Sequence, residues 1–423
     1  MGRLTRQLRL VFLGTALVVA AFSTGISFLF FVVYLLAILS TASWLYARRG
    51  LRGLRAGYHV LNPHSQVGEV LEAVYRVDNE TNWGKPWVEL SNESTLPTPM
   101  PGRAIGVGAH GSRQWLARVP MTRRGSYRLG ALRVRTGDPF GLFTTEMVVG
   151  RPTWIVVFPK IHQLPNWRLP PSPVDGTAPS RRRYEAATPL VSTVRPYVYG
   201  DAINRIHWLS SVRHGELHVK EFDLEQTADL WLIVDLDRSA HAGTGDQASV
   251  EAAVSAAASI AVRTLADNRA VGITVSGRRL QLLTPDRGTR VEQKILNLLA
   301  NVQADGARPL AEVVVETMPQ LRRGMTVCLI TGSIDRDWVR AVAVLRRRGV
   351  GVMAVLLDLA SYAGREDEAA PAELAAMRHA LAEHDIGYHL LRANHDLALA
   401  LGGRSQAPGR SGMRQGPRVR TRA

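Results

Sequence analysis

The stretch "LWLIVDLD", residues Leu230–Asp237, decides the fold of the second half of the chain. It opens with a continuous apolar run, which is typical of a strand buried on both faces of a parallel sheet. Similar apolar strands at Met325–Gly332 and Val350–Asp358 alternate with helical patterns. This alternation predicts an α/β domain over residues 229–402, with a parallel sheet covered on both faces. Its helices are expected at Gln247–Arg269, Val291–Val302, Leu310–Leu321, Asp337–Arg348 and Pro371–Glu383.

A charged block, residues 194–228, leads into that domain and contains "VRPYVYGDAINRIHWLSSVRHGELHVKEFDLE". It could be a catalytic centre, a ligand cradle or a salt-bridged joint. Asp201 and His207 could act as orienter and base, but no nucleophile is indicated beside them. The residue pattern favours a joint, which leaves room for partner recognition through exposed members of the block.

The joint interpretation assigns a structural role to each part of the block. Gly200 and Asp201 form a turn, Ile206 and Trp208 supply an apolar anchor, and "ELHVKEFDLE" is an edge strand that enters the α/β sheet. Arginines can form bidentate pairs with the acids of the block. The expected pairs join Arg195, Arg205 and Arg213 to Asp201, Glu221 and Glu225.

Residues 56–164 predict an all-β, sandwich-like domain, because short strands are separated by turn signals about every ten residues. Within "GSRQWLARVPMTRRGSYRLGALRVRT" (Gly111–Thr136), the segments "RRGS" and "LGA" are expected to break the chain into two or three strands. Residues 165–193 are rich in Pro, Ser, Ala and Arg and are expected to form an exposed connector.

The N-terminal segment 1–55 is apolar and uncharged from Leu10 to Tyr46. A single span needs about 20 residues, so this run is too long for one span and tight for two. A turn at Ser23–Gly25 would give a transmembrane helical hairpin, and arginines on both flanks place both ends in the cytoplasm. A single span and a cleaved signal peptide are the alternatives. The hairpin predicts a multi-pass protein of the cell (inner, cytoplasmic) membrane whose bulk is cytoplasmic and lies against membrane lipid.

The net charge of +16 comes mostly from the two ends of the chain. Residues 1–55 hold seven arginines and no acid, and the basic tail 403–423, expected to be disordered, holds six and no acid. Only +3 remains between them, so the high isoelectric point does not indicate a nucleic-acid-binding domain. The single cysteine, Cys328, permits no internal disulfide.

Several motifs together resemble the bacterial family called domain of unknown function 58 (DUF-58). The segment Thr122–Phe143, "TRRGSYRLGALRVRTGDPFGLF", is similar to that family's "RRG-x-Y-x-LG … DPFGLF" signature, and "VFP" at Val157–Pro159 to its "VYP". The charged block is similar to the family's longest motif, from which Pro196 and Val212 depart. We predict that the conspicuous positions of this motif serve either partner binding or the structure of the block. These positions are Arg195, Tyr197, Gly200, Asp201, Arg205, Trp208, Arg213, Lys220 and Glu221.

The resemblance implies that the α/β domain is similar to a von Willebrand factor type A (vWA) domain, which can hold Mg²⁺ through a D-x-S-x-S loop. Here Asp235, Asp237 and Ser239 form D-x-D-x-S, and their oxygens suit that ion. The later vWA ligands are missing: "ADGARPLAEV" offers no Thr, and Gly332–Ser333 replace the expected Asp. The structural alternative is that both aspartates cap the turns that follow them or form ion pairs with nearby arginines. We therefore expect no cofactor. The alternative to test is that Mg²⁺ binds at this loop.

The sequence predicts a membrane-tethered, non-enzymatic scaffold or adaptor whose vWA-like domain binds other proteins. Family members are often linked with MoxR-type AAA+ ATPases, so the resemblance implies such a cytoplasmic partner and no nucleic acid. The alternative is a metal-assisted hydrolase centred on Asp235 and Asp237.

Overall fold

The computed structural model describes residues 2–170, 191–198, 206–222, 229–364 and 369–403. The chain divides into two compact units. The first comprises Met1–Lys160 with Leu296–Asn301, and the second comprises Ile161–Ile295 with Val302–Ala423.

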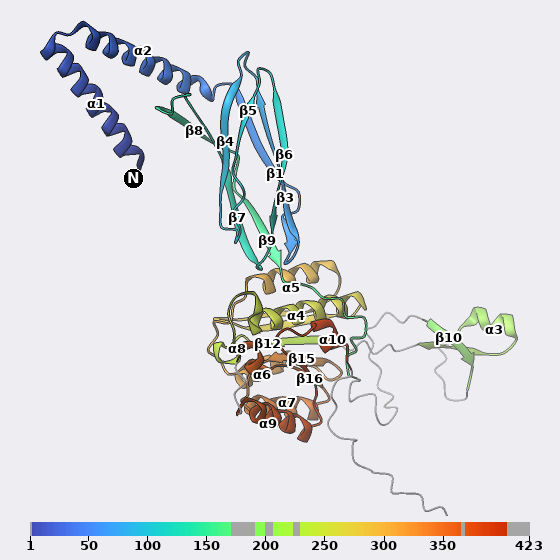
Figure 1. The fold of residues 1–423 in the computed structure, drawn as a ribbon. Coiled ribbons are helices and arrows are strands. Elements are labelled where there is room, and N and C mark those ends of the chain that lie inside the picture. Colours follow the sequence, from blue (N-terminus) through green and yellow to red (C-terminus); the bar gives the residue numbers. More distant parts are fainter. Residues whose placement is uncertain (1, 171–190, 199–205, 223–228, 365–368, 404–423) are drawn as a thin grey trace, which may run out of the picture. The chain divides into compact units, whose positions relative to one another are not determined.

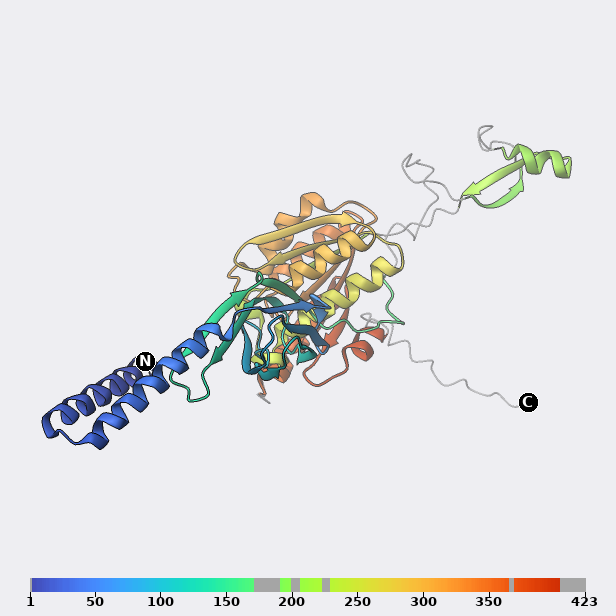
Figure 2. The ribbon, with the colours of Figure 1, turned by 90° about the horizontal axis from the view of Figure 1, so that it is seen from above.

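The first unit begins with two helices, α1 (Gly2–Thr24) and α2 (Ser27–Gly50). The chain reverses direction between them (Figure 1, Figure 2), where Gly25 adopts a positive φ of 67°. Phe22 and Phe30 close this turn through an edge-to-face ring contact at 5.2 Å. By length and composition α2 could serve as a membrane anchor or as a signal segment.

A β-rich region follows the helices and has the two-sheet arrangement expected for a sandwich. One sheet has the strand order β1-β3-β6, and the other has the order β2-β9-β7-β4-β5, with β8 paired to β7. Alternate residues of β3 and β7 point into a shared core that includes Leu71, Val77, Leu129 and Val134. The bounds are β1 Leu54–Val60, β2 His64–Gln66, β3 Val70–Asn79, β4 Lys85–Ser94, β5 Arg103–Val107, β6 Ser112–Pro120, β7 Gly125–Gly137, β8 Thr144–Val149 and β9 Thr153–Phe158.

The predicted strand break at "LGA" is wrong, because β7 runs unbroken from Gly125 to Gly137. The segment instead marks an irregularity in the pairing with β4, where Leu129 and Leu132 lie opposite Ser94 and Asn92. Before this bulge β7 pairs with β9, and after it β7 pairs with β8. Gly130 therefore lets the strand bend and change partner, as bulged positions commonly do.

The second unit contains a six-stranded mixed, mostly parallel sheet in the order β14-β13-β12-β15-β16-β17. Only β14 is antiparallel, because residues 277–279 join it to β13 and three residues are too few for a crossover. The bounds are β12 Leu230–Val234, β13 Val271–Ser276, β14 Leu280–Asp286, β15 Thr326–Thr331, β16 Gly351–Leu357 and β17 Gly387–Leu391.

Helices cover both faces of this sheet (Figure 1). The face bearing Trp231 packs on α6, α7 and α9, with Trp338 of α7 also fully buried. Helix α4 covers the other face; it is long and apolar enough to span a membrane but is largely buried as a core helix. The bounds are α4 Ser249–Ala266, α5 Thr289–Asn301, α6 Leu310–Thr317, α7 Asp337–Arg347, α8 Leu359–Ala363, α9 Ala369–Glu383 and α10 Leu397–Gly402.

Three elements precede the sheet in the sequence, and together we call them the arm: β10 (Val191–Pro196), α3 (Trp208–His214) and β11 (His218–Phe222). The expectation that "ELHVKEFDLE" enters the α/β sheet is wrong for its described part. Strand β11 pairs antiparallel with β10, and these two strands form a sheet of their own.

Candidate functional site

The first candidate site lies where β12 and β15 end side by side. The two strands are parallel neighbours, and the chain continues to β13 on one side and to β16 on the other. This is the topological switch point of the sheet, where open α/β folds form a crevice at the carboxyl ends of the strands. Asp235 directly follows β12, and Thr331 is the last residue of β15.

Asp235 is completely buried, and both of its carboxylate oxygens accept hydrogen bonds. Thr331 Oγ1 donates to Oδ2 at 2.6 Å, and the backbone amide of Asp237 donates to Oδ1 at 3.0 Å. Burial raises the pKa of Asp235 to about 6, although both hydrogen bonds favour the ionised form. The site therefore holds a carboxyl group whose pKa is raised to about 6 by burial.

Asp237 and Ser239 form the turn that follows. Asp237 Oδ1 accepts hydrogen bonds from the amide of Ser239 at 2.9 Å and from its hydroxyl at 3.0 Å. The backbone of this turn is held by Gly306, whose carbonyl accepts from the Arg238 amide at 3.1 Å. In this structure the carboxylate oxygens of Asp235 and Asp237 therefore accept hydrogen bonds from the turns that follow them, as the turn-capping interpretation predicts.

The side chain of His241 also contacts this loop. Its Nε2 lies 2.8 Å from the Asp235 carbonyl oxygen, and its Nδ1 lies 3.0 Å from the hydroxyl of the buried Ser249. The imidazole thus links the loop after β12 to the first turn of α4.

The oxygens that could hold a hard cation come from Asp235, Asp237, Ser239 and Thr331. These are suitable ligand types for Mg²⁺, but in this structure they are hydrogen-bonded to one another and to backbone amides. No group of three or more His, Cys, Asp or Glu side chains that could hold a metal occurs in the described ranges.

The structure places the charged block only in part. Gly200, Asp201, Arg205 and Glu225 lie outside the described residues, so the predicted turn and the predicted ion pairs that involve these residues lie there as well. The side chains of Arg195, Lys220 and Glu221 are also not described, although their backbones belong to β10 and β11. The members whose side chains are described are half-buried Tyr197, exposed Trp208 and exposed Arg213.

The predicted apolar anchor holds for only one of its two residues. Ile206 is 6% exposed, but Trp208 is 63% exposed, so the assignment of Trp208 to a buried anchor is wrong in this structure. Trp208 and Val212 are four residues apart on α3 and therefore lie on one face, with Leu209 beside them. Leu209 is 71% exposed and Val212 is 82% exposed, so the arm presents a continuous apolar surface.

His207, the predicted base, instead caps α3. Its Nδ1 accepts a hydrogen bond from the Ser210 amide at 3.1 Å, and its amide donates to the carbonyl of His218. The ring nitrogen facing the helix is thus occupied by a structural contact.

Three features of these sites were not predicted from the sequence. Thr331 could have been found as the last residue of a buried strand, had the adjacency of β12 and β15 been known. No local signal indicates the role of His241. The exposure of the α3 face could have been suspected from its consecutive large apolar residues, Trp208 and Leu209.

Comparison with known proteins matches residues 193–361 to the family described as "Protein of unknown function DUF58". The chain is 26% identical to uncharacterized protein YeaD of Bacillus subtilis (strain 168), over 57% of this chain and 57% of that protein. It is also 26% identical to uncharacterized protein Rv1480 of Mycobacterium tuberculosis (strain H37Rv), over 39% of this chain and 53% of that protein. The chain thus spans a little over half the length of these relatives.

Two solved structures show weaker likeness. The CARDB domain of a Pyrococcus furiosus protein is 15% identical over 25% of this chain and 86% of that chain, with a TM-score of 0.19. Proximal thread matrix protein 1 from the mussel byssus is 12% identical over 42% of this chain and 46% of that chain, with a TM-score of 0.28.

The matched segment contains most of the arm and both sides of the switch point. It begins in β10 and ends in α8, and it therefore includes Asp235 and Thr331. Residues 193–361 are thus similar to the DUF58 family, whose description assigns no function.

Proposed function

We propose that this chain is a membrane-tethered scaffold without catalytic activity, which binds a cytoplasmic protein through its vWA-like α/β unit and its arm. The observation that carries the proposal is the apolar surface of α3, made of Trp208, Leu209 and Val212. Large exposed apolar side chains that lie together on one helix mark an interaction surface more often than a solvated one. The family match includes this helix.

The tether is the apolar N-terminal region. Helix α2 is long enough to cross a bilayer. Because the chain reverses direction between α1 and α2 (Figure 1), the start of α1 and the end of α2 would lie on the same side of the membrane. The arginines before and after the apolar run favour a hairpin with both ends in the cytoplasm, since positive charge collects on that side. We therefore propose the inner membrane as the location, with both units cytoplasmic. A topology reporter fused after residue 60 or at the C-terminus should give a cytoplasmic signal, and a periplasmic signal from either would reject the hairpin.

We propose a MoxR-type AAA+ ATPase as the partner, on the family resemblance. The test measures binding of a purified MoxR-type ATPase from the source organism to the full chain in nanodiscs. Trp208→Ser with Leu209→Ser should weaken binding at least tenfold, because interface cores rely on a few large apolar residues. Leu399→Ser removes an equally exposed leucine from α10 and should leave binding unchanged. Equal binding by all three proteins would reject the α3 surface, and no binding by the wild type would reject this partner.

The alternative function is a metal-assisted hydrolase centred on Asp235 and Asp237. The buried carboxyl group at the switch point favours it, because such crevices bind ligands and perturbed pKa values gather at functional sites. Hydrolysis of phosphate or carboxylic esters that requires Mg²⁺ and is abolished by Asp235→Asn would establish this function. It would also overturn the non-enzymatic scaffold.

A further inference from the structure

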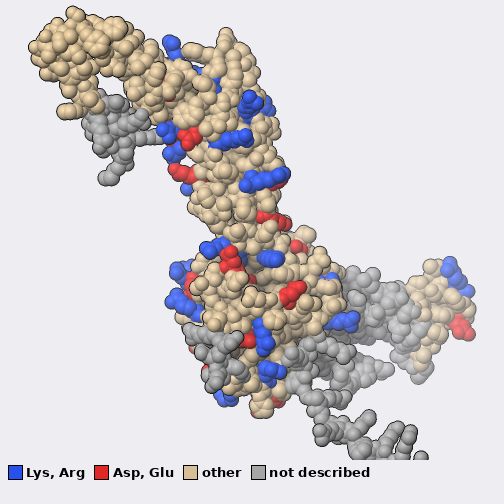
Figure 3. All heavy atoms as spheres, viewed as in Figure 1, with Lys and Arg blue, Asp and Glu red and all other residues tan. Residues whose placement is uncertain are grey.

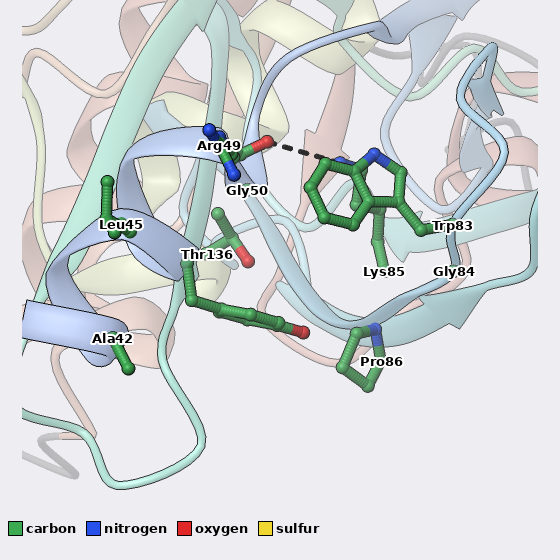
Figure 4. Close-up of a pocket in the computed structure, with 10 residues that line it drawn as sticks. Ala42, Leu45, Arg49, Gly50, Trp83, Gly84, Lys85, Pro86 and Thr136 are labelled. Carbon is green, nitrogen blue, oxygen red and sulfur yellow. Dashed lines mark hydrogen bonds between the residues drawn. The ribbon is translucent and has the colours of Figure 1, made fainter. Parts of the chain in front are cut away.

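A pocket of about 290 Å³ lies in the first unit where α2 ends against the β-rich region (Figure 4). Its walls come from the last turns of α2, from the loop that enters β4, and from Thr136 of β7. Gly50 closes the helix directly against Thr136: a Cβ at this glycine would lie 2.6 Å from Thr136 Cγ2. The residues that line the pocket include Tyr46, Arg49, Trp83 and Lys85.

Lys85 is the unusual member of this pocket. It is 6% exposed, its Nζ donates to the Arg49 carbonyl at 3.2 Å, and it lies 5.5 Å from the centre of the Trp83 ring. An ammonium group has three donors, and within the described part of the chain no carboxylate forms an ion pair with Lys85. Burial lowers the pKa of Lys85. The group is thus a nearly buried cation that no carboxylate of the described residues neutralises.

Capping of α2 explains only part of this arrangement. The last carbonyls of a helix lack intrahelical partners, and a lysine can satisfy one of them. The Arg49 carbonyl takes up one donor of Lys85, and Arg49, which carries a second positive charge, is itself one of the residues that line the pocket. Two positive charges at one cavity favour an anionic ligand.

The position of the pocket along α2 matches the depth of phospholipid headgroups. The hydrocarbon core requires about 20 helical residues, so a span that starts at Ser27 leaves the core near Tyr46. Aromatic residues gather at this level, as they do at membrane interfaces: Trp44 stacks under Arg48 at 5.2 Å, and Trp83 and Trp87 are partly exposed nearby. In Figure 3 the described surface of the helices is uncharged, and Lys and Arg appear where α2 reaches the β-rich region.

We infer that this pocket binds the phosphate of an anionic phospholipid, such as phosphatidylglycerol, between Lys85 and Arg49. The inference rests on the membrane tethering proposed above and adds a defined lipid site to it. Lysine and arginine are suited to phosphate recognition, and basic pockets on the cytoplasmic side of membrane helices bind lipid headgroups. Tyr46 and Trp83 would flank the glycerol region at the interface.

The test reconstitutes the full chain into phosphatidylcholine vesicles that contain a minor fraction of brominated phosphatidylglycerol or brominated phosphatidylcholine. Bromine quenches the fluorescence of nearby tryptophans, and Trp44, Trp83 and Trp87 lie close to the pocket. The wild type should be quenched more by the phosphatidylglycerol. Lys85→Met should reduce this preference about fivefold, the effect of one charge at a membrane surface.

Matched variants separate a specific site from general attraction. Lys85→Arg keeps the charge and should keep most of the preference, and Arg49→Gln changes an exposed side chain and should lower the preference without affecting folding. Arg113→Met removes one exposed charge from β6 of the same unit and should leave the preference intact. Equal quenching by both lipids, or an equal loss in Lys85→Met and Arg113→Met, would overturn the lipid site.

Two further arms distinguish the possible sources of failure. If inorganic phosphate abolishes the preference even at a concentration below that of phosphatidylglycerol in the vesicles, the pocket selects free phosphate and the lipid assignment is wrong. Flotation of the vesicles tests the tether itself: a wild type that does not float with them rejects both tether and lipid site. Flotation with equal quenching rejects only the lipid site.

Discussion

Trp231 of β12 and Trp208 of α3 belong to the same unit but occupy opposite environments. Trp231 is 1% exposed, packs against α6 and α7, and donates from Nε1 to Thr274 Oγ1 at 2.8 Å. Trp208 is 63% exposed. The core strand uses its tryptophan to stabilise the fold, whereas the arm displays its tryptophan at the surface. The difference shows that aromatic residues in a distinctive sequence block need not be structural.

The largest effect should come from the core. Trp231→Ala should lower the free energy of unfolding by about 3–5 kcal/mol, because it empties a large buried site and leaves Thr274 without its partner. Chemical denaturation of the purified full chain, followed by circular dichroism, measures this loss. Trp154→Ala is the control, because Trp154 is exposed on β9. Equal midpoints for both variants would contradict the assignment of Trp231 to the core.

The second effect concerns Asp235, whose folded pKa of about 6 lies above the ordinary aspartate value of 3.8. A raised carboxyl pKa means that the folded state binds the proton more tightly than the unfolded state. The contribution of Asp235 to stability is therefore largest below about pH 4 and is lost as the pH rises through about 6. The difference between these two pKa values corresponds to roughly 3 kcal/mol.

Asp235→Asn should remove this part of the pH dependence. The variant cannot ionise, so the difference in unfolding free energy between wild type and variant should change between pH 4 and pH 7 and stay flat above pH 7. Thermal or chemical denaturation of the full chain at several pH values gives that difference. If added Mg²⁺ suppresses the pH dependence of the wild type alone, the carboxylate binds the ion. A difference that does not vary with pH would mean that Asp235 keeps an ordinary pKa.

A smaller effect is expected from the glycine that holds the switch-point turn. In Gly306→Ala the new Cβ would lie 2.3 Å from the Ser276 carbonyl oxygen and 2.9 Å from that of Leu236. Both are backbone atoms, one at the end of β13 and one in the loop after β12, so the loop must move, and we expect a loss of about 1–3 kcal/mol. Gly57→Ala is the control, because a Cβ at Gly57 meets nothing within 4 Å. Unchanged stability of Gly306→Ala would show that this loop adjusts freely.

The elements of the α/β unit could be predicted because their signals are local. The apolar run at Leu230–Val234 gave a buried strand, and the predicted helix Leu310–Leu321 begins at Leu310. It ends earlier than predicted, at Thr317, and a 3-10 turn containing Pro319 follows. Proline has no backbone N–H to continue an α-helix, so even this difference has a local cause.

The site could not be predicted because it depends on contacts between distant residues. Asp235 and Thr331 are 96 residues apart, and only the strand order brings them together. The strand order follows from how the helices pack on the sheet, for which no single stretch of sequence carries a signal. The exposure of Trp208 is of the same kind, since an aromatic residue on a short helix has the same local pattern whether it is buried or displayed.

The smallest stability effect should be that of Trp208→Ala. This variant tests the comparison between Trp208 and Trp231 most directly. An exposed side chain contributes little to folding, so the free energy of unfolding should change by less than about 0.5 kcal/mol. A buried joint would instead lose about 3–5 kcal/mol. Denaturation of the full chain distinguishes the two values, with Trp231→Ala measured in parallel. A large loss would mean that the arm docks through Trp208 in solution, and the block would then be the joint that its charge pattern predicts. A small loss combined with weaker partner binding would assign the α3 surface to recognition, since a change that spares the fold and removes binding can act only at an interface.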